Sequence, residues 1–283
     1  MPELPEVETV ARHVSPKLKG LEVSNARLLY SRALRDKGLG SLVKLKGRRI
    51  IGVRRRGKML LIDFEGEMSL LFHFKMTGQF LFSPGSEPVD KHTHFILRFK
   101  DAARELRFRD TRKFGFISFL RSSDLLSSKE LKNLGPEPFE ISLSRFAGLF
   151  RGRKARLKSL LLNQNFLAGI GNIYSDEILF ESKLHPLTRA SSLDEDDLKR
   201  MFKAMRNVLR KAIRSRGTSV RDFVDCEGRE GNYQNFLRVY GRESLPCFIC
   251  GEKIIRIRLG GRSSFFCPSC QKRDVVSLFR LRK

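Results

Sequence analysis

CFICGEKIIRIRLGGRSSFFCPSC, residues 247–270, contains two Cys-x-x-Cys pairs separated by 16 residues. The runs KIIRIRL and SSFFC, on either side of a Gly-Gly pair, are typical of two strands joined by a turn. So short a segment cannot build a core of its own and needs a cross-link. The spacing therefore predicts a zinc ribbon with one structural Zn²⁺ and no open position for a reacting water, rather than incidental buried thiols. The four predicted ligands are Cys247, Cys250, Cys267 and Cys270.

Upstream of the ribbon, apolar residues recur at helical spacing, so this half of the chain is expected to be mainly α. The expected helices cover residues 143–150, 155–163, 173–182 and 194–214. The polar, glycine-rich segment 217–240 is typical of a mobile loop. Within it, Cys226 is expected to be an ordinary unpaired thiol. The prolines and glycine of GPEPF, at residues 135–139, indicate a linker to the first half.

The first half has a different pattern. Residues 5–18 place Val7, Val10 and Val14 at helical spacing and predict one amphipathic helix. Residues 21–120 then form short apolar or alternating runs, which indicate an antiparallel sandwich or barrel. The expected strands are LEVSNARLLY, RIIGVRRR, KMLLIDF, MSLLFHF, HFILRF, ELRFR and GFISFL. The fold class is therefore α+β.

The charge of the chain restricts its partners. Its 283 residues include 56 Lys and Arg against 31 Asp and Glu, a net charge of +25 with a pI near 10.4. This excess is far beyond what solubility requires and implies a polyanionic partner. No apolar run is long enough to span a membrane, and the first ten residues carry three glutamates where a signal peptide would be basic. We expect a cytoplasmic protein without a membrane partner.

Two stretches concentrate the positive charge. Residues 44–58 contain eight Lys or Arg and residues 145–158 contain six, with no acid in either. Phosphate contact is the favoured interpretation, and a solvated basic face is the alternative. The sequence RDTRKFGF at 109–116 interleaves arginine with phenylalanine, and HFKMTGQF at 73–80 holds Met76 in a polar turn. Such side chains suit insertion into a base stack, although each taken alone is more often a core residue.

The N-terminus allows two interpretations. Pro5 and the glutamates around it favour the start of a helix and need no other role. Alternatively, removal of Met1 exposes Pro2 as a secondary amine. An α-amino group with a pKa of about 7.7 to 8 is partly neutral and nucleophilic at physiological pH. Glu3, the next residue, is placed to supply or take a proton.

Eight motifs occur along the chain in one order: MPELPEVETV, RRGKMLL, HFKMTG, DTRKFG, LGPEP, LAGIGNIYSDEILF, VYGRESLPCFIC and GGRSSFFCPSCQ. In these motifs the chain resembles bacterial formamidopyrimidine-DNA glycosylase from Pro2 to Gln271. The resemblance implies a β-sandwich, a helix-two-turn-helix domain and a zinc hairpin, with DNA in the cleft between the two main domains. The implied parts are a catalytic sandwich at 1–125, a linker at 126–140, the helix-two-turn-helix domain at 141–245, a zinc finger at 246–272 and a basic tail at 273–283.

The resemblance also implies a function, namely base-excision repair of double-stranded DNA by a monomer that is both DNA glycosylase and abasic-site lyase. The implied substrates are oxidised purines, chiefly 8-oxoguanine opposite cytosine and formamidopyrimidines. Pro2 resembles the nucleophile that forms a Schiff base, Glu3 the general acid, Lys58 the lysine of β-elimination and Arg262 the arginine of δ-elimination. Met76, Arg112 and Phe114 resemble the residues that fill the space of the extruded base. The implied phosphate contacts are His92, Arg112, Arg153 and Asn172, and 218–240 aligns with the loop that closes over the base.

Two other functions stay open. A pyrimidine-preferring relative of the endonuclease VIII type is disfavoured by the opening MPELPEVE. A lesion-binding zinc protein without catalysis is disfavoured because Pro2, Glu3, Lys58 and Arg262 are all present. The tail RDVVSLFRLRK extends past the usual end of the family pattern, and a disordered end is expected there, with unspecific DNA affinity as the alternative.

Overall fold

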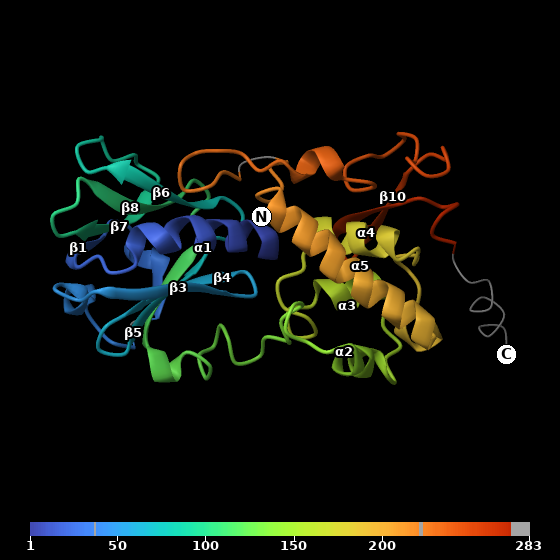
Figure 1. Cartoon of the computed structure of the whole chain (residues 1–283), viewed down its shortest axis with the longest axis horizontal. Helices are drawn as coiled ribbons and strands as arrows, with labels where there is room; N and C mark the ends of the chain where they lie inside the picture. The colour runs from blue at the N-terminus through green and yellow to red at the C-terminus, as the bar shows by residue number, and fades with distance from the viewer. Residues whose placement is uncertain (37, 221–222, 273–283) are drawn as a thin grey trace. The chain divides into compact units, whose positions relative to one another are not determined.

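The computed structural model describes residues 1–36, 38–220 and 223–272 (Figure 1). The tail at 273–283 lies outside the described residues. The chain forms two compact units. The first comprises Met1–Asn133 and Ala212–Gln234, and the second comprises Leu134–Lys211 and the described residues from Asn235. Residues 212–234 are thus grouped with the sandwich. The domain boundaries expected from the sequence stay predictions.

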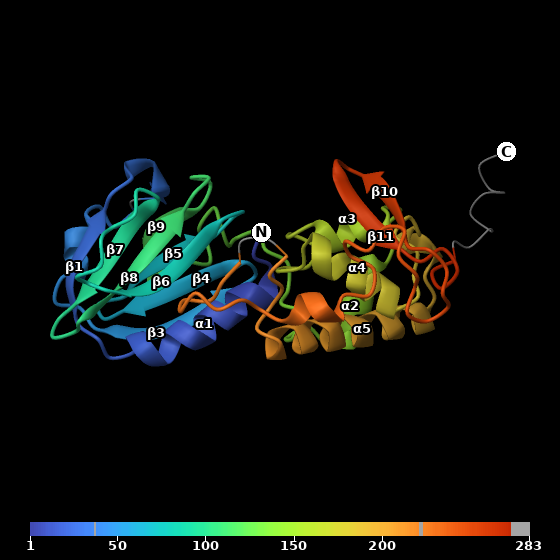
Figure 2. The ribbon, with the colours of Figure 1, turned by 90° about the horizontal axis from the view of Figure 1, so that it is seen from above.

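The first unit contains two sheets, whose strands are drawn in Figure 2. One has the strand order β1-β7-β8-β6 and the other β2-β9-β5-β4-β3. All neighbours are antiparallel except β2, which pairs with β9 in parallel. The strands are β1 (Val23–Leu28), β2 (Leu34–Asp36), β3 (Ile50–Arg56), β4 (Met59–Phe64), β5 (Met68–His73), β6 (Gly78–Pro84), β7 (Thr93–Phe99), β8 (Arg104–Asp110) and β9 (Phe116–Arg121).

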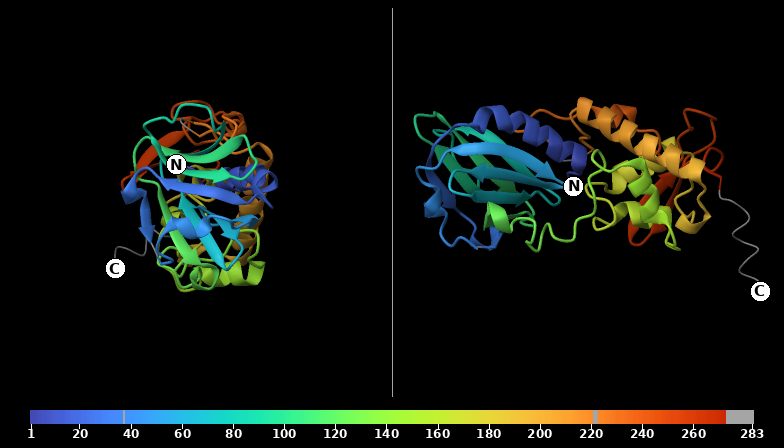
Figure 3. Two further views of the ribbon diagram at one scale, coloured as in Figure 1. Left: turned by 90° about the vertical axis from the view of Figure 1, so that its left-hand side faces the viewer. Right: turned by 60° about the horizontal axis from the view of Figure 1, so that its bottom comes forward.

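The helix α1 (Leu4–Leu18) lies along β3 and β4 (Figure 3). Its apolar residues recur at helical spacing, so they form one face that joins the core of the sheets. Within this core, Phe72, Phe80 and Phe108 are in mutual edge contact at ring-centroid distances of 4.8 to 6.0 Å. Each of these large rings buries a large apolar area and so contributes to the hydrophobic stabilisation of the unit.

The second unit is mainly helical. Its helices are α2 (Leu143–Phe150), α3 (Leu157–Leu162), α4 (Asn172–Glu181) and most of α5 (Glu195–Arg214). The hairpin of β10 (Ile255–Leu259) and β11 (Arg262–Phe266) follows. Its turn is made by Gly260 and Gly261, whose φ angles of +55° and +76° favour glycine. Short 3₁₀ helices cover Ser31–Ala33, Leu42–Leu45, Ser122–Asp124, Ala190–Ser192 and Tyr233–Phe236.

The predicted α+β class is confirmed. Every predicted helix and strand has a counterpart, with helix ends that differ by two residues or fewer. The strands β2 and β6 were not predicted. The strand β6 starts at Gly78, directly after the turn that holds Met76, and the polar residues of that turn concealed it. Among the described residues, no helix combines the length and the apolarity that crossing a bilayer requires.

Candidate active site and zinc site

The end of α1 that carries Pro2 is buried. Pro2 is buried and Glu3 is only 2% exposed. Glu3 and Glu6 form a capping box, in which Glu6 Oε2 accepts the Glu3 backbone N–H at 2.8 Å and the Glu3 side chain accepts the Glu6 N–H. These reciprocal bonds fix the direction of the chain at the helix start, so the backbone around Pro2 is held in one orientation.

Glu6 also connects the helix start to the predicted loop. Its other oxygen, Oε1, accepts the backbone N–H of Thr218 at 2.8 Å. Gly217 lies so close that an added Cβ would stand 2.8 Å from Glu6 Oε1, and at Gly231 an added Cβ would stand 2.3 Å from the Gly217 carbonyl. Gly231 N–H donates to Ser219 Oγ at 2.8 Å. The described part of this loop is thus irregular but closely hydrogen-bonded.

Lys58 lies in the turn between β3 and β4 and is only 6% exposed. Arg55, near the end of β3, binds Glu8 of α1 through Nε at 2.9 Å and donates to the Gly57 carbonyl at 3.0 Å. Burial raises the pKa of Glu8, but the bonds from Arg12 and Arg55 outweigh burial and lower it. Glu8 therefore ties the turn that holds Lys58 to the helix that starts beside Pro2. This role of Glu8 was not predicted from the sequence.

His73 is the neighbour of the Lys58 turn on β5, because Met59 pairs with His73 across the sheet. Burial, together with the positive charges of Lys75, Lys58 and Arg35, lowers the pKa of His73 to about 3. The imidazole is therefore neutral, and its Nδ1 accepts the Lys75 backbone N–H at 3.0 Å. Sequence reasoning missed this residue, since a single histidine within a strand has no recognisable spacing.

Met76 and Phe114 are exposed rather than part of the core. Their exposed fractions are 38% and 49%. Each follows a residue with positive φ, Lys75 at +51° and Lys113 at +58°, so both turns adopt a costly backbone conformation. The Arg112 guanidinium lies 4.9 Å from the centre of the Phe114 ring. We call Met76, Arg112 and Phe114 the wedge residues.

Buried Asp110 joins the two turns that carry the wedge residues. Its Oδ1 accepts from the Thr77 hydroxyl and from the Arg112 N–H, the latter at 3.2 Å, and its Oδ2 accepts the Gly115 N–H at 2.6 Å. The Asp110 N–H donates to the His92 carbonyl at 2.9 Å, which holds His92 beside the same turn. Sequence reasoning missed Asp110, although an acid at the start of a short polar turn that ends in glycine was a usable signal.

Asn172 is the first residue of α4, in the second unit. Gln164 shapes the loop before it, with Oε1 accepting the Gly169 N–H at 2.9 Å and Nε2 donating to the Ile170 carbonyl at 2.8 Å. Asn172 Nδ2 donates to the Ser263 carbonyl of β11 at 3.0 Å. The start of a helix has N–H groups that can bind an anion, so this loop and helix can bind phosphate.

The two arginines proposed for the second unit are both exposed. Arg262 is the first residue of β11 and adjoins Ser263, so the structure brings Arg262 near Asn172. Arg153 follows α2, donates through Nε to the Leu149 carbonyl at 2.8 Å, and has its guanidinium 5.3 Å from the centre of the Phe166 ring.

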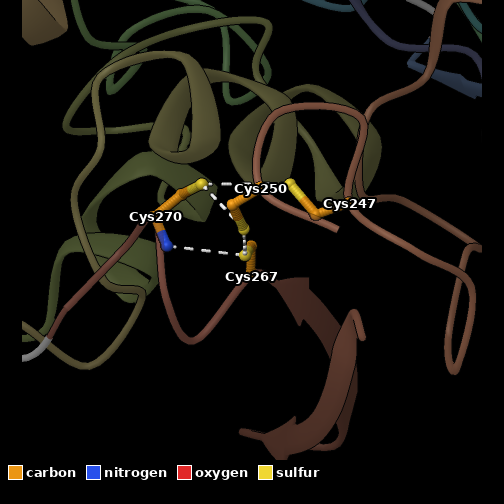
Figure 4. A group of neighbouring side chains, drawn as sticks. All are labelled: Cys247, Cys250, Cys267 and Cys270. Atoms are coloured by element: carbon orange, nitrogen blue, oxygen red, sulfur yellow. Dashed lines mark hydrogen bonds between the residues drawn. The ribbon is translucent and has the colours of Figure 1, made fainter. Parts of the chain in front are cut away.

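The four predicted zinc ligands converge at one end of the hairpin (Figure 4). Their Sγ atoms all lie within 4.8 Å of one another, with separations of 3.9 Å for Cys247 to Cys270 and 3.5 Å for Cys250 to both Cys267 and Cys270. Four thiolates at about 2.3 Å from a tetrahedral zinc are about 3.8 Å apart, so the residues fit one Zn²⁺. The Glu252 N–H is the main cause that lowers the pKa of Cys250 to about 7, whereas burial raises the pKa of Cys267 and of Cys270.

A sandwich with an N-terminal helix, joined in sequence to a helical unit with a four-cysteine hairpin, defines a two-unit zinc-ribbon protein. Three family models match this chain: the formamidopyrimidine-DNA glycosylase N-terminal domain over residues 1–117, its H2TH domain over 134–224, and the zinc finger found in FPG and IleRS over 244–273. The chain belongs to the formamidopyrimidine-DNA glycosylase family.

Relatives match over nearly their full lengths. A curated formamidopyrimidine-DNA glycosylase from Pelotomaculum thermopropionicum is 42% identical, over 96% of this chain and 99% of the relative. A Lactococcus lactis FPG mutant, solved with Fapy-dG containing DNA, matches with a TM-score of 0.89 and 34% identity, over 96% of this chain and 100% of the relative. The Lactococcus lactis Fpg solved with abasic-site containing DNA matches with a TM-score of 0.88, 33% identity and the same coverage.

Proposed function

We propose that this family member removes oxidised purines from duplex DNA and then cleaves the strand at the resulting abasic site. The observation that carries the proposal is the buried, capped helix start with Pro2 and Glu3, which Glu8 and Arg55 tie to the turn holding Lys58. The Lactococcus lactis complexes with Fapy-dG and abasic-site DNA support the substrate class. The enzyme would act as a monomer on chromosomal DNA in the cytoplasm.

The first step is extrusion of the damaged base, which costs a few kcal/mol of stacking and pairing. Met76 and Phe114 are exposed apolar side chains, and Arg112 adds a charge beside them, so the wedge residues can fill the gap and contact the opposite cytosine. We assign the backbone phosphates to His92, Arg112, Arg153 and Asn172. The net charge of +25 favours this binding. The loop of residues 218–240, of which 221 and 222 lie outside the described residues, would then close over the extruded base.

The second step is covalent. After removal of Met1, the Pro2 nitrogen attacks C1′, and the bond from C1′ to the base breaks. The base leaves with the electrons of that bond and takes up the proton that the amine gives up. Glu3 donates a proton to the ring oxygen as the sugar opens, and an iminium forms between Pro2 and C1′. The pKa of a terminal amine, about 7.7 to 8, leaves enough neutral Pro2 for attack at physiological pH.

The third step is strand cleavage. We assign Lys58 to β-elimination, in which a proton leaves C2′ and the 3′ phosphate departs, and Arg262 to δ-elimination, in which the 5′ phosphate departs. Water then releases the sugar fragment from Pro2. The four cysteines would hold one Zn²⁺ that supplies structural cross-linking of the hairpin, and Arg262 lies on that hairpin.

Borohydride trapping tests the proposal. A duplex with 8-oxoguanine opposite cytosine should give a covalent adduct, which Pro2→Gly should reduce strongly. Pro5→Ala is the matched control, because it changes a proline of the same helix start and leaves the amine in place. Mass spectrometry of the active protein should show a free Pro2. Binding without any adduct would favour a non-catalytic lesion-binding protein, and faster reaction of a duplex carrying an oxidised pyrimidine would favour the pyrimidine-preferring alternative.

A further inference from the structure

A buried ion pair joins α3 to α4. Lys158 and Asp176 are each 1% exposed, and Lys158 Nζ lies 2.6 Å from Asp176 Oδ1. Removing two charges from water costs several kcal/mol. Well-packed apolar side chains of similar volume often stabilise a protein interior at least as well as a buried ion pair does. Stability alone therefore does not account for an ion pair at this position.

Lys158 and Asp176 make further hydrogen bonds to α4 and β11, the elements that begin with Asn172 and Arg262. Both of these residues are proposed to contact DNA phosphates. Lys158 Nζ also donates to the carbonyl of Asn172, at 3.1 Å. The Asp176 carboxylate accepts from the Ser264 hydroxyl at 2.8 Å and from the Phe265 backbone N–H at 3.1 Å. One buried pair thus contacts both the first residue of α4 and the middle of β11.

Arg262 adjoins this bonded stretch of β11. Asn172 donates to the Ser263 carbonyl, so three consecutive residues, 263–265, are hydrogen-bonded to α4. Arg262 precedes them directly, after the Gly-Gly turn, and pairs with Leu259. Cys267 lies at the opposite end of β11 from Arg262. The metal site therefore fixes one end of the strand, and the bonds from α4 fix the end that carries the arginine.

We propose that Asp176, together with Lys158, is a positioning residue that sets Arg262 for δ-elimination. The inference rests on the proposed function, because it takes Arg262 to contact the phosphate that leaves in this step. In δ-elimination a proton leaves C4′ for water, a C4′=C5′ double bond forms, and the 5′ phosphate departs with the electrons of the C5′–O bond. A guanidinium neutralises the departing phosphate only when it is correctly placed, and a displacement of about 1 Å can cost on the order of a hundredfold in rate.

The test uses the full-length, zinc-loaded protein and an abasic duplex, with β- and δ-elimination products separated on a denaturing gel. Asp176→Asn keeps the shape of the side chain but removes its charge. We expect the ratio of δ to β product to fall on the order of tenfold, while the borohydride adduct forms at the wild-type rate and one zinc per chain remains. The double variant Lys158→Met with Asp176→Leu removes the pair without leaving a buried charge, and it should give the same fall.

Glu177→Gln is the matched control. Glu177 is the adjacent buried acid on α4, and its carboxylate accepts the backbone N–H groups of Arg238, Val239 and Tyr240 instead of bonding β11. Its substitution should lower stability and leave the product ratio unchanged. A wild-type ratio in both Asp176 variants, an equal loss of both products, or loss of zinc would each overturn the inference. Absence of any adduct or product in the wild-type protein would instead refute the proposed function, and this inference with it.

Discussion

His73 is a buried base surrounded by positive charges. Because burial and the nearby cations lower its pKa to about 3, the unfolded chain binds a proton below pH 6.5 that the folded chain does not. As the pH falls from 6.5 towards 3, this residue should therefore lower the free energy of unfolding by about 1.4 kcal/mol for each pH unit.

Urea denaturation followed by circular dichroism between pH 5 and pH 8 measures this dependence. His73→Asn keeps an acceptor for the Lys75 N–H and should remove this part of the pH slope below pH 6.5. His92→Asn, at a half-buried histidine, is the control and should keep the slope. Parallel stability curves for wild type and His73→Asn would contradict the prediction.

Gly115 closes the turn that carries Arg112 and Phe114. A Cβ added there would lie 2.7 Å from the Phe108 ring and 3.0 Å from Asp110 Oδ2, so the turn must shift. We expect Gly115→Ala to cost about 1 to 3 kcal/mol in the free energy of unfolding and to weaken binding of lesion-containing DNA. Thermal unfolding and fluorescence anisotropy measure the two effects.

Gly148→Ala is the control for this substitution. Nothing lies within 4 Å of an added Cβ at Gly148 in α2, so alanine should stabilise by roughly 0.5 to 1 kcal/mol. A stable Gly115→Ala protein with normal DNA affinity would show that the turn has more room than its geometry indicates.

At the scale of elements, the β10–β11 hairpin depends on its metal site. Cys267→Ser removes one of four ligands and should lower the zinc content from one ion per chain to near zero. The exposed Arg262 then loses its support, and DNA affinity should fall at least tenfold, whereas the sandwich should stay folded because it has its own core. Metal analysis, DNA binding and limited proteolysis measure these outcomes. Cys226→Ser is the control and should keep one zinc ion per chain, because Cys226 is not one of the four ligands. An unchanged zinc content in Cys267→Ser would contradict the assignment of the metal site.

For the whole molecule, the net charge of +25 makes DNA affinity an electrostatic property. The logarithm of the binding constant should fall with the logarithm of salt concentration, by about 0.9 for each phosphate neutralised. Arg153→Gln should lower this slope by about 0.9, because it removes one proposed phosphate contact. Arg200→Gln, which removes a charge paired with Asp197 on α5, should leave the slope unchanged. A nearly flat salt response would argue against phosphate contact by both basic stretches.

Local patterns in the sequence predicted the helices, most strands and the zinc ligands, because periodicity, Cys spacing and turn residues act over a few positions. The strand β6 was missed where a polar turn runs directly into it. The family motifs supplied the expected roles of Pro2, Glu3, Lys58 and Arg262. For Lys58 and Arg262 these roles came only from resemblance to known proteins, whereas the exposed amine of Pro2 and the carboxyl of Glu3 also offered a catalytic role from their own chemistry.

Only the tertiary structure decided which residues orient the proposed site. Glu8 meets Arg55, Asp110 meets Thr77, and Asp176 meets Ser264, each pair far apart in the chain. Such contacts leave no periodic trace in a sequence, because a single buried carboxylate resembles a surface acid until its partners are brought to it. The sequence left open whether Met76 and Phe114 are exposed or part of the core, because an apolar residue is usually buried. The folded turns place both side chains at the surface.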